Sequence, residues 1–314
     1  MSRLVLGFDT SNYTTSVAVF DGRQGRNIGK LLDVPEGGLG LRQSDALFQH
    51  VKRLPELVQT LAGAEELNTV QAVGASTRPR AVEGSYMPCF LAGTSQAQAM
   101  ACVLKVPFFA CSHQQGHLAA AAWSAGRLDL LDSPFLAWHL SGGTTELLYV
   151  EPEGCNVKAR IIGGTSDISA GQLIDRAGVL LGLQFPAGKA LDALYGQGEP
   201  TKPFRVKLQG LEFSLSGMEN KVKSMVQAGE QPAAVARFTL DTVADVVVRA
   251  TKQAQLDYPG LPVLCSGGVA SNARLRQAMG EQCGAIFAKP EFSTDNAMGV
   301  AILSHRAMEK GELG

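Results

Sequence analysis

The chain has 314 residues, 45% of them hydrophobic, and a formal net charge of −1 with a pI near 6.5. This length and composition predict a large buried core and two lobes rather than one. Because the net charge creates no basic field, contact with nucleic acid would need a local patch or a partner. No apolar run reaches the length of a membrane span, so we expect no membrane partner.

The six cysteines form no C-x-x-C pair and no tight framework, which predicts reduced thiols. The opening MSRLVLGFDTS lacks the charged, apolar and cleavage regions of a signal peptide. Both observations favour a cytoplasmic location.

The first part of the chain predicts a hairpin followed by helices and short strands. The segment RLVLGFDTSNYTTSVAVFDG consists of an apolar strand, a polar turn over residues 10–15 and a second alternating strand. Helices are expected over Asp45–Ala62 and Ala92–Leu104, with short strands near residues 73 and 109. The apolar face expected for the first helix consists of Leu47, Val51, Leu54, Leu57, Val58 and Leu61.

The strand–turn–strand pattern recurs in FLAWHLSGGTTELLYVEPEG, from residue 135 on. The recurrence predicts that one α/β unit is duplicated, with lobes over 1–133 and 134–314 that share a cleft. The other elements expected in the second lobe are helices over Ser169–Leu183 and Thr239–Gln255, a buried strand between Gly260 and Gly268, a helix from Ser271 and a closing helix over Asn296–Lys310.

His113 and His117 are two of only five histidines, and they lie beside an alanine run that favours a helix. Residues i and i+4 share one helix face, so both imidazoles can reach one zinc or ferrous ion. Gln114 occupies the place of the glutamate in the metalloprotease string H-E-x-x-H, so the hydrolytic base is missing. The alternative is a pair of partly buried histidines with polar neighbours.

Two strands end in Ser-Gly-Gly, at residues 141–143 and 266–268. Without a Cβ, backbone N–H groups can approach an anion, and the helix after the second turn adds its dipole. Either turn alone could be a plain tight turn. Together with the polar turn at 10–15 they predict a nucleotide cleft. Actin-like ATPases, sugar kinases and carbamoyl-transferring enzymes share such turns, so the fold alone does not define the reaction.

A series of motifs resembles the tRNA threonylcarbamoyladenosine synthase family, historically called O-sialoglycoprotein endopeptidase. Beside the histidine pair, they are DTSNYTT at 9–15, SGGTTEL at 141–147, LIDRAGVLLGLQFPAGKA at 173–190, FSLSGMEN at 213–220, GGVASNARLR at 267–276 and PEFSTDNAM at 290–298. They occur in family order over nearly the whole chain. The resemblance implies an α/β, duplicated actin-like (ribonuclease H-like) fold with nucleotide and metal in an interlobe cleft.

The resemblance implies that His113, His117 and Asp295 ligate Fe²⁺ or Zn²⁺, with the histidines in the first lobe and Asp295 in the second. Two imidazoles and one carboxylate leave positions open for substrate. ATP, ADP or an acyl-adenylate is the implied ligand, and no catalytic residue is assigned. The implied nucleotide contacts are Thr10, Ser11, Ser141, Gly142, Gly143, Thr144, Thr145, Asp175, Gly188, Gly267, Gly268 and Asn272. The alternatives are a helix-surface acid for Asp175 and a helix cap for Asn272.

The implied activity is a metal-dependent acyltransferase that moves a threonylcarbamoyl group from an adenylate to an amine, with tRNA adenosine as acceptor. The implied partners are tRNA and a second family subunit, or a second copy, joined through the N-terminal lobe. Alternatives are a non-catalytic scaffold that binds nucleotide and metal, or a carbamoyltransferase with another acceptor. A sugar-kinase-like enzyme would not explain the histidine pair, and a metalloprotease ranks last.

The departures from the family pattern concentrate on the acceptor side. Tyr13 and Thr14 replace the family's Asp-Glu, and Thr144 replaces a histidine. Arg78-Pro79-Arg80 replaces Gly-Pro-Gly, and these arginines either bind a phosphate or carboxylate or form a solvated basic turn. A phenol with a pKa of about 10 and a threonine hydroxyl substitute poorly for two acids. We therefore expect a divergent paralogue that does not by itself replace the ordinary synthase on tRNA.

Overall fold

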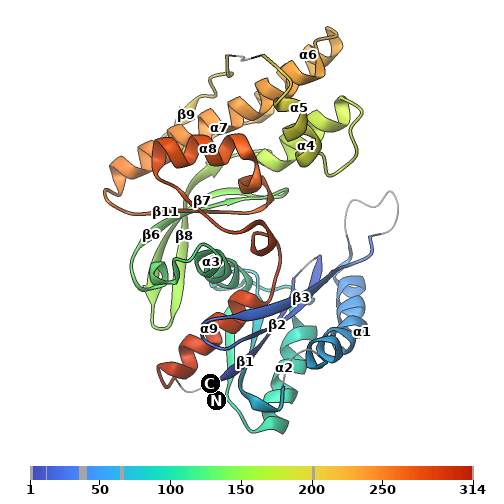
Figure 1. Ribbon diagram of the computed structural model, residues 1–314, viewed down its shortest axis with the longest axis vertical. Coiled ribbons are helices and arrows are strands. Elements are labelled where there is room, and N and C mark those ends of the chain that lie inside the picture. Colours follow the sequence, from blue (N-terminus) through green and yellow to red (C-terminus); the bar gives the residue numbers. More distant parts are fainter. Residues whose placement is uncertain (1–2, 12, 35–40, 64–66, 200–201, 313–314) are drawn as a thin grey trace. The chain divides into compact units, whose positions relative to one another are not determined.

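The computed structural model describes residues 3–11, 13–34, 41–63, 67–199 and 202–312 (Figure 1). They form two compact units: unit 1 comprises residues 1–133, 151–159 and 294–314, and unit 2 comprises residues 134–150 and 160–293. The sequence predicts a boundary at residues 133/134, whereas the structure also groups the segments 151–159 and 294–314 with unit 1. The closing helix packs on the first sheet, and Asp295 therefore lies in the same unit as the histidine pair.

Unit 1 is built on a five-stranded sheet with the order β3-β2-β1-β4-β5. Its strands are β1 (Leu4–Thr10), β2 (Thr14–Phe20), β3 (Gly25–Leu31), β4 (Val70–Arg78) and β5 (Phe108–Ser112). β1 and β2 form the expected antiparallel hairpin, whereas β4 is parallel to β1 and β5 is parallel to β4. Parallel neighbours need crossover connections, which the helices supply.

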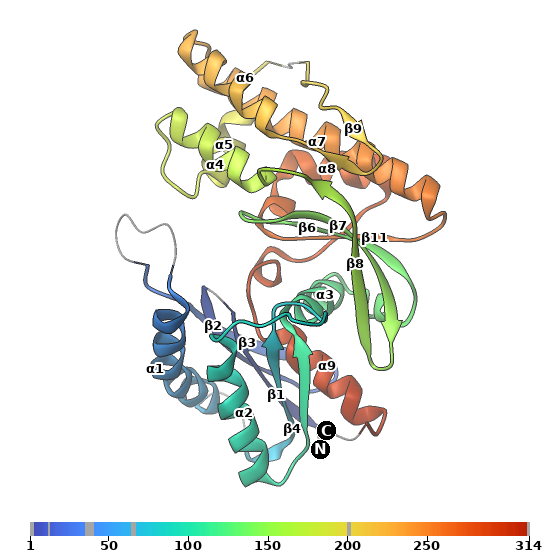
Figure 2. The same cartoon turned by 180° about the vertical axis from the view of Figure 1, so that it is seen from behind.

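Helices cover both faces of this sheet (Figure 2). On one face are α1 (Gln43–Ala62) and α2 (Phe90–Leu104), and on the other α9 (Met298–Glu309), with α3 (His113–Ser124) packed against it. Alternate residues of β1 point to opposite faces. Phe8 belongs to the core with α1 and α2, whereas Val5 packs with Ala307 of α9. The odd-numbered residues of β1 therefore face α9.

The apolar face expected for α1 is only partly buried. Leu54, Leu57 and Leu61 lie in the core, but Val51 is 48% exposed. At 100° per residue, Val51 falls at the edge of the stripe that these leucines form, so it borders solvent.

Unit 2 repeats the strand order of unit 1 in a seven-stranded sheet, β12-β11-β6-β7-β8-β10-β9. Its strands are β6 (Phe135–Leu140), β7 (Thr145–Glu153), β8 (Asn156–Thr165), β9 (Leu208–Gln209), β10 (Glu212–Phe213), β11 (Val263–Ser266) and β12 (Ile286–Phe287). β6 is antiparallel to β7 and parallel to β11, as β1 is to β2 and β4. The shared order of five strands confirms the duplication that the sequence predicts.

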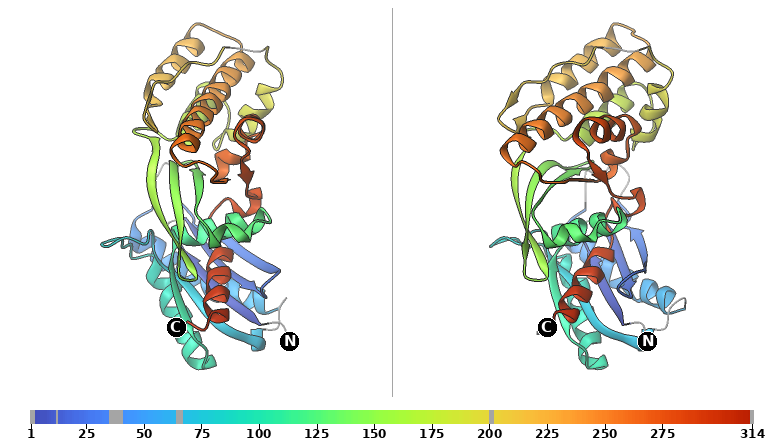
Figure 3. Two further views of the ribbon diagram at one scale, coloured as in Figure 1. Left: turned by 90° about the vertical axis from the view of Figure 1, so that its left-hand side faces the viewer. Right: turned by 60° about the vertical axis from the view of Figure 1, so that its left-hand side comes forward.

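The helices of unit 2 form a layer against its sheet (Figure 3). They are α4 (Ala170–Leu180), α5 (Gly188–Tyr195), α6 (Ser216–Gln227), α7 (Pro232–Asp257) and α8 (Ala273–Cys283). α7 contacts the other four, and the Trp138 indole N–H on β6 donates to Thr251 Oγ1 of α7 at 2.8 Å. α7 begins before the expected Thr239, at Pro232, because proline is well suited to a first helical turn.

Among the described residues, no helix combines the length and apolar character that a membrane span requires.

Candidate metal centre and phosphate-binding turns

His113, His117 and Asp295 come together in unit 1. The Nε2 atoms of His113 and His117 lie 3.5 Å and 3.3 Å from Asp295 Oδ1 and 2.9 Å from each other. One ligand atom from each side chain lies within 4.8 Å of the other two. Two imidazole nitrogens and one carboxylate oxygen at this spacing fit a zinc or ferrous ion.

Close contact between α3 and α9 places these side chains. α3 starts at His113 with a capping box, in which Ser112 and Gln115 exchange hydrogen bonds. A Cβ on Gly299 of α9 would lie 1.7 Å from the carbonyl oxygen of Gly116 on α3. Only a residue without a side chain permits this approach. The crossing brings the segment before α9, which carries Asp295, beside the histidine pair.

The carboxylate of Asp9 orients His113. Asp9 is fully buried at the end of β1, on the face toward α9, and its Oδ1 lies 2.9 Å from His113 Nδ1. Ser76 Oγ donates to the same oxygen. From this geometry we assign the Nδ1–H tautomer to the neutral form of His113, in which the Nε2 lone pair is available to a metal. The sequence analysis did not predict this role for Asp9. An acid within an apolar strand is nevertheless a recognisable signal, because a buried carboxylate needs a partner.

The two hydroxyl residues after Asp9 have different surroundings. Ser11 Oγ donates to Asp295 Oδ2 at 3.0 Å, so Ser11 positions one of the candidate metal ligands. Thr10 points to the opposite face of the sheet, toward α2. Its hydroxyl donates to the Cys89 carbonyl at 3.0 Å and accepts from Gly93 N–H at 3.1 Å. The Thr10 hydroxyl therefore holds the start of α2.

The buried carboxylates favour a positive charge at this site. Burial lowers the pKa of His113, but Asp9 and Asp295 outweigh burial and raise that pKa to about 10. Burial also raises the pKa of Asp295, yet hydrogen bonds from His113 and His117 hold it well below its usual range. A proton or a metal ion can supply the favoured charge, so the two compete.

We expect Asp9→Asn to weaken metal binding by about 10- to 100-fold, the usual effect of losing a carboxylate that orients a ligating histidine. An amide can present N–H₂ instead of an acceptor to His113 Nδ1 and so favour the wrong tautomer. Chelator competition with Zn²⁺ measures the affinity, and Asp45→Asn at an exposed position of α1 is the matched control. Unchanged affinity would show that Asp9 does not orient the ligand.

The first Ser-Gly-Gly turn joins β6 to β7 in unit 2. Ser141 N–H donates to the Thr144 carbonyl at 2.8 Å, and Thr144 N–H donates to Ser141 Oγ at 3.1 Å. Ideal Cβ atoms on Gly142 and Gly143 would meet no atom within 4 Å. Hydrogen bonds between Ser141 and Thr144 therefore close the turn, and the space beside its two glycines is free of protein atoms.

The start of α4 is tied to this turn. The Ser169 hydroxyl donates to the Gly142 carbonyl at 2.6 Å, and Ala170 N–H donates to Thr145 Oγ1 at 2.8 Å. A Cβ on Gly171 would lie 2.4 Å from the Ser141 carbonyl oxygen, so the helix approaches the turn closely. The positive end of the α4 dipole therefore lies beside the turn, which favours an anion there.

The second Ser-Gly-Gly turn lies next to the first. Gly267 follows β11 with φ +97°, and a Cβ there would lie 2.2 Å from the Leu140 carbonyl oxygen, directly before Ser141. Glycine is required at such a position. A Cβ on Gly268 would meet nothing within 4 Å. The parallel pairing of β6 and β11 thus brings the two turns to one edge of the sheet.

Asp175 and Asn272, also predicted as nucleotide contacts, form hydrogen bonds at the first residues of nearby helices. Asp175 Oδ1 accepts from Ala187 N–H at 2.8 Å, directly before Gly188 begins α5. Asn272 Oδ1 caps α8 by accepting from Leu275 N–H at 2.9 Å, and its amide donates to Asp192 Oδ1 of α5 at 2.9 Å. The side chain of Asn272 therefore has the helix-cap role that the sequence left open.

Two of the departures from the family pattern adjoin elements that carry the candidate metal ligands or Asp9, namely Thr14 and the Arg78–Arg80 turn. Thr14 is buried, and it shares a face of β2 with Ser16, which pairs with Asp9. Tyr13 is 44% exposed. The carbonyl of Pro79, between the two arginines, accepts from Gln114 N–H at 3.0 Å. The Arg78–Arg80 turn therefore borders the start of α3.

Solved structures with a similar arrangement have the actin-like ATPase fold. Full-length HypF in its phosphate- and nucleotide-bound form matches with a TM-score of 0.62 at 13% identity, over 98% of this chain and 46% of that one. Component A of (R)-2-hydroxyglutaryl-CoA dehydratase from Acidaminococcus fermentans matches with a TM-score of 0.57 at 14% identity, over 98% and 100%. These matches concern the fold alone, and they confirm the duplicated actin-like architecture.

Sequence comparison defines the family. The profile of tRNA N6-adenosine threonylcarbamoyltransferase matches residues 36–302. A relative of that name from Thermus thermophilus is 35% identical over 98% of this chain and 94% of its own length. One from Nitrosomonas eutropha is 32% identical over 95% and 90%. The chain belongs to the tRNA N6-adenosine threonylcarbamoyltransferase family, as its motifs predict.

Proposed function

We propose that this chain is an acyltransferase that moves a threonylcarbamoyl group from an adenylate to the N6 amine of a tRNA adenosine. The observation that carries this proposal is the convergence of His113, His117 and Asp295 within 4.8 Å in a chain of this family. A purely structural scaffold would need no such donor set. With Gln114 after the first histidine, the cluster also lacks the general base of a metalloprotease.

The donor set fits Fe²⁺ or Zn²⁺, which we propose as the cofactor. A bound divalent ion would supply a Lewis acid that polarises a substrate oxygen. The residues around the donors prepare the site before substrate arrives. Asp9 holds the tautomer of His113, and Ser11 holds the second oxygen of Asp295. Their hydrogen bonds reduce the reorganisation needed for ligand binding.

We propose that ATP, ADP or the acyl-adenylate binds at the two Ser-Gly-Gly turns of unit 2. The open sides of Gly142, Gly143 and Gly268, together with the start of α4, suit a phosphate. Backbone N–H groups there would stabilise the negative charge on the departing adenylate phosphate. Asp175 keeps a second carboxylate oxygen for a ribose hydroxyl, because within the described ranges its one hydrogen bond is the bond from Ala187 N–H to Oδ1.

The proposed partners are tRNA and, through the N-terminal lobe, a second copy or a related family subunit. We propose a cytoplasmic location, in keeping with a tRNA-modifying role. A carbamoyltransferase for another acceptor and a nucleotide-binding scaffold are the alternatives that the experiment below separates.

The activity is tested in a strain depleted of its synthase, supplied with this chain and the standard partner proteins. Mass spectrometry of tRNA nucleosides measures the modified adenosine. We expect partial restoration, because Tyr13 and Thr14 replace an acid pair that could take the proton of the attacking amine. The double variant Tyr13→Asp, Thr14→Glu should raise the yield.

The double variant His113→Ala, His117→Ala is the inactive control in this strain. If neither the unaltered chain nor the acid-restored variant produces modified adenosine, the proposed acceptor is wrong. Full restoration by the unaltered chain would show that the acid pair is dispensable, and the expectation of a divergent paralogue would fail.

A further inference from the structure

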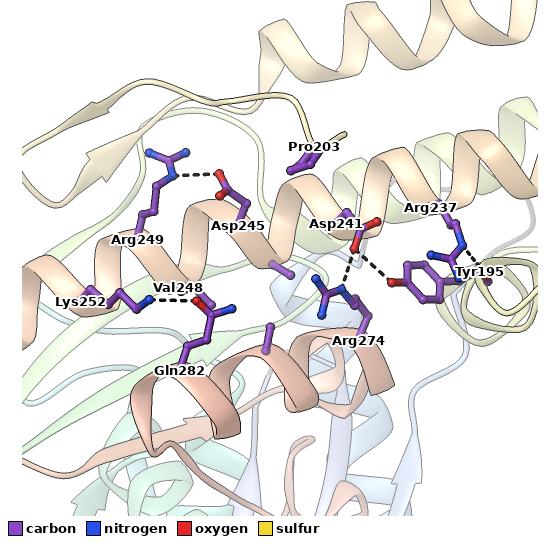
Figure 4. A pocket seen from close by; sticks show the side chains of 12 residues that line it. Tyr195, Pro203, Arg237, Asp241, Asp245, Val248, Arg249, Lys252, Arg274 and Gln282 are labelled. Carbon is purple, nitrogen blue, oxygen red and sulfur yellow. Dashed lines mark hydrogen bonds and ion pairs between the residues drawn. The ribbon is translucent and has the colours of Figure 1, made fainter. Parts of the chain in front are cut away.

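A second candidate site lies in unit 2, in a groove between α7 and α8 (Figure 4). Its volume is about 460 Å³, and its apolar lining includes Ala244, Val248 and Ala278. The groove shares no residue with the metal centre or the glycine turns. Its charged lining consists of the cations Arg237, Arg249, Lys252 and Arg274 and the acids Asp241 and Asp245. We call it the α7–α8 groove.

Three arginines of the α7–α8 groove are held by hydrogen bonds from their Nε atoms, and Arg249 Nε donates to Asp245 Oδ2 at 2.8 Å. Arg274 Nε donates to Asp241 Oδ1 at 2.6 Å, and the Tyr195 hydroxyl donates to the same oxygen at 3.1 Å. Arg237 Nε donates to the Tyr195 carbonyl at 3.0 Å, and its guanidinium stacks 4.4 Å from the Tyr195 ring centroid. Figure 4 shows both interactions around Tyr195.

The terminal nitrogens of Arg237 and Arg274 make no hydrogen bond within the described part of the chain. Their guanidinium groups are thus oriented by the fold but keep donors available. Because its orientation is already fixed, such a guanidinium can bind two phosphate oxygens through parallel N–H groups.

A basic loop over residues 202–207 forms the rim of the α7–α8 groove. Phe204 N–H donates to Thr242 Oγ1 at 2.9 Å, and an Arg249 terminal N–H donates to the Val206 carbonyl at 2.7 Å, so the loop is fixed along α7. Its exposed cations, which have no acidic partner among the residues described, are Lys202, Arg205 and Lys207. The rim therefore extends the positive charge of the groove along the surface.

We propose that the α7–α8 groove and its rim bind phosphates of an RNA backbone, so that tRNA contacts unit 2 through residues that do not belong to the candidate metal centre. The chain has a net charge of −1, so electrostatic attraction of RNA needs a local patch such as this one. Cations spread from α8 across α7 to an exposed loop suit successive phosphates of an extended chain. The inference rests on the proposed function in that it takes tRNA as the RNA.

Reversal of the rim charges tests the inference. The triple variant Lys202→Glu, Arg205→Glu, Lys207→Glu alters exposed side chains, so the thermal unfolding midpoint should stay close to that of the unaltered chain. The matched control, Arg23→Glu, Arg26→Glu, Lys30→Glu, makes the same charge change at exposed positions of unit 1. Fluorescence anisotropy with labelled tRNA, repeated at several salt concentrations, gives the affinity and its salt dependence.

We expect the rim variant to lose about tenfold or more in tRNA affinity. Its negative slope of log K against log salt should become less steep, by about 0.9 for each lost phosphate contact. The control variant should change both quantities much less. Arg274→Lys keeps a positive charge beside Asp241 but loses the parallel N–H groups of the guanidinium. We therefore expect it to lose less tRNA affinity than the rim variant. Equal behaviour of the rim and control variants would overturn the inference.

Free pyrophosphate offers the same chemistry as an RNA phosphate, and calorimetry separates the two. If pyrophosphate binding depends on Arg274 while tRNA affinity is unchanged in the rim variant, the groove serves a small ligand and the inference is wrong. A chain that shows the expected rim effect but produces no modified adenosine supports this inference and contradicts the proposed function. A chain with no affinity for tRNA contradicts both.

Discussion

The double variant His113→Ala, His117→Ala should lose the divalent metal almost completely. It removes both imidazole nitrogens and leaves Asp295 as the one remaining member of the triad, and a single carboxylate holds zinc or ferrous iron poorly. Elemental analysis of the purified protein measures the metal content per chain. Gln114→Ala, on the same turn of α3, is the matched control and should retain the metal.

Equal metal content in the double variant and the unaltered chain would reject the triad as the metal site. The dependence of binding on pH gives a second measurement. The pKa of His113 in the metal-free chain is raised to about 10, so binding near neutral pH must displace a proton. Metal affinity should therefore rise as pH increases toward that value. An affinity that does not vary with pH would contradict a role for His113 as a ligand.

Gly143→Val should abolish nucleotide binding while the fold stays intact. A Cβ at Gly143 would meet no atom within 4 Å, so unit 2 can accommodate the larger side chain. The two added methyl groups would fill the open side of the turn, where a phosphate must approach the backbone N–H groups. Isothermal calorimetry with ATP and ADP measures the loss.

Gly280→Val is the matched control for this variant. Gly280 lies exposed on α8, and a Cβ there also meets nothing within 4 Å. Circular dichroism should show folded protein for both variants, and only Gly143→Val should lose the ligand. If ATP and ADP bind Gly143→Val with normal affinity, the Ser-Gly-Gly turns are structural and the nucleotide site lies elsewhere.

Local patterns in the sequence were sufficient to predict the type and approximate position of many helices and strands. The hairpin before residue 20, the helix with the histidine pair and the repeated strand–turn–strand unit all occur in the structure. Hydrophobic period and turn composition act over a few residues, so they can be read without the fold. The motif match also placed the chain in its family and named the three side chains that converge at the candidate metal centre.

The tertiary structure decided which side chains surround that triad. Asp9 contacts His113 because odd-numbered residues of β1 face α9, and Thr10 has another role because the next residue of a strand points the other way. Asp295 joins unit 1 because α3 and α9 meet at Gly116 and Gly299. Strand facing and helix crossing arise from packing between segments far apart in the chain, and no local pattern encodes them.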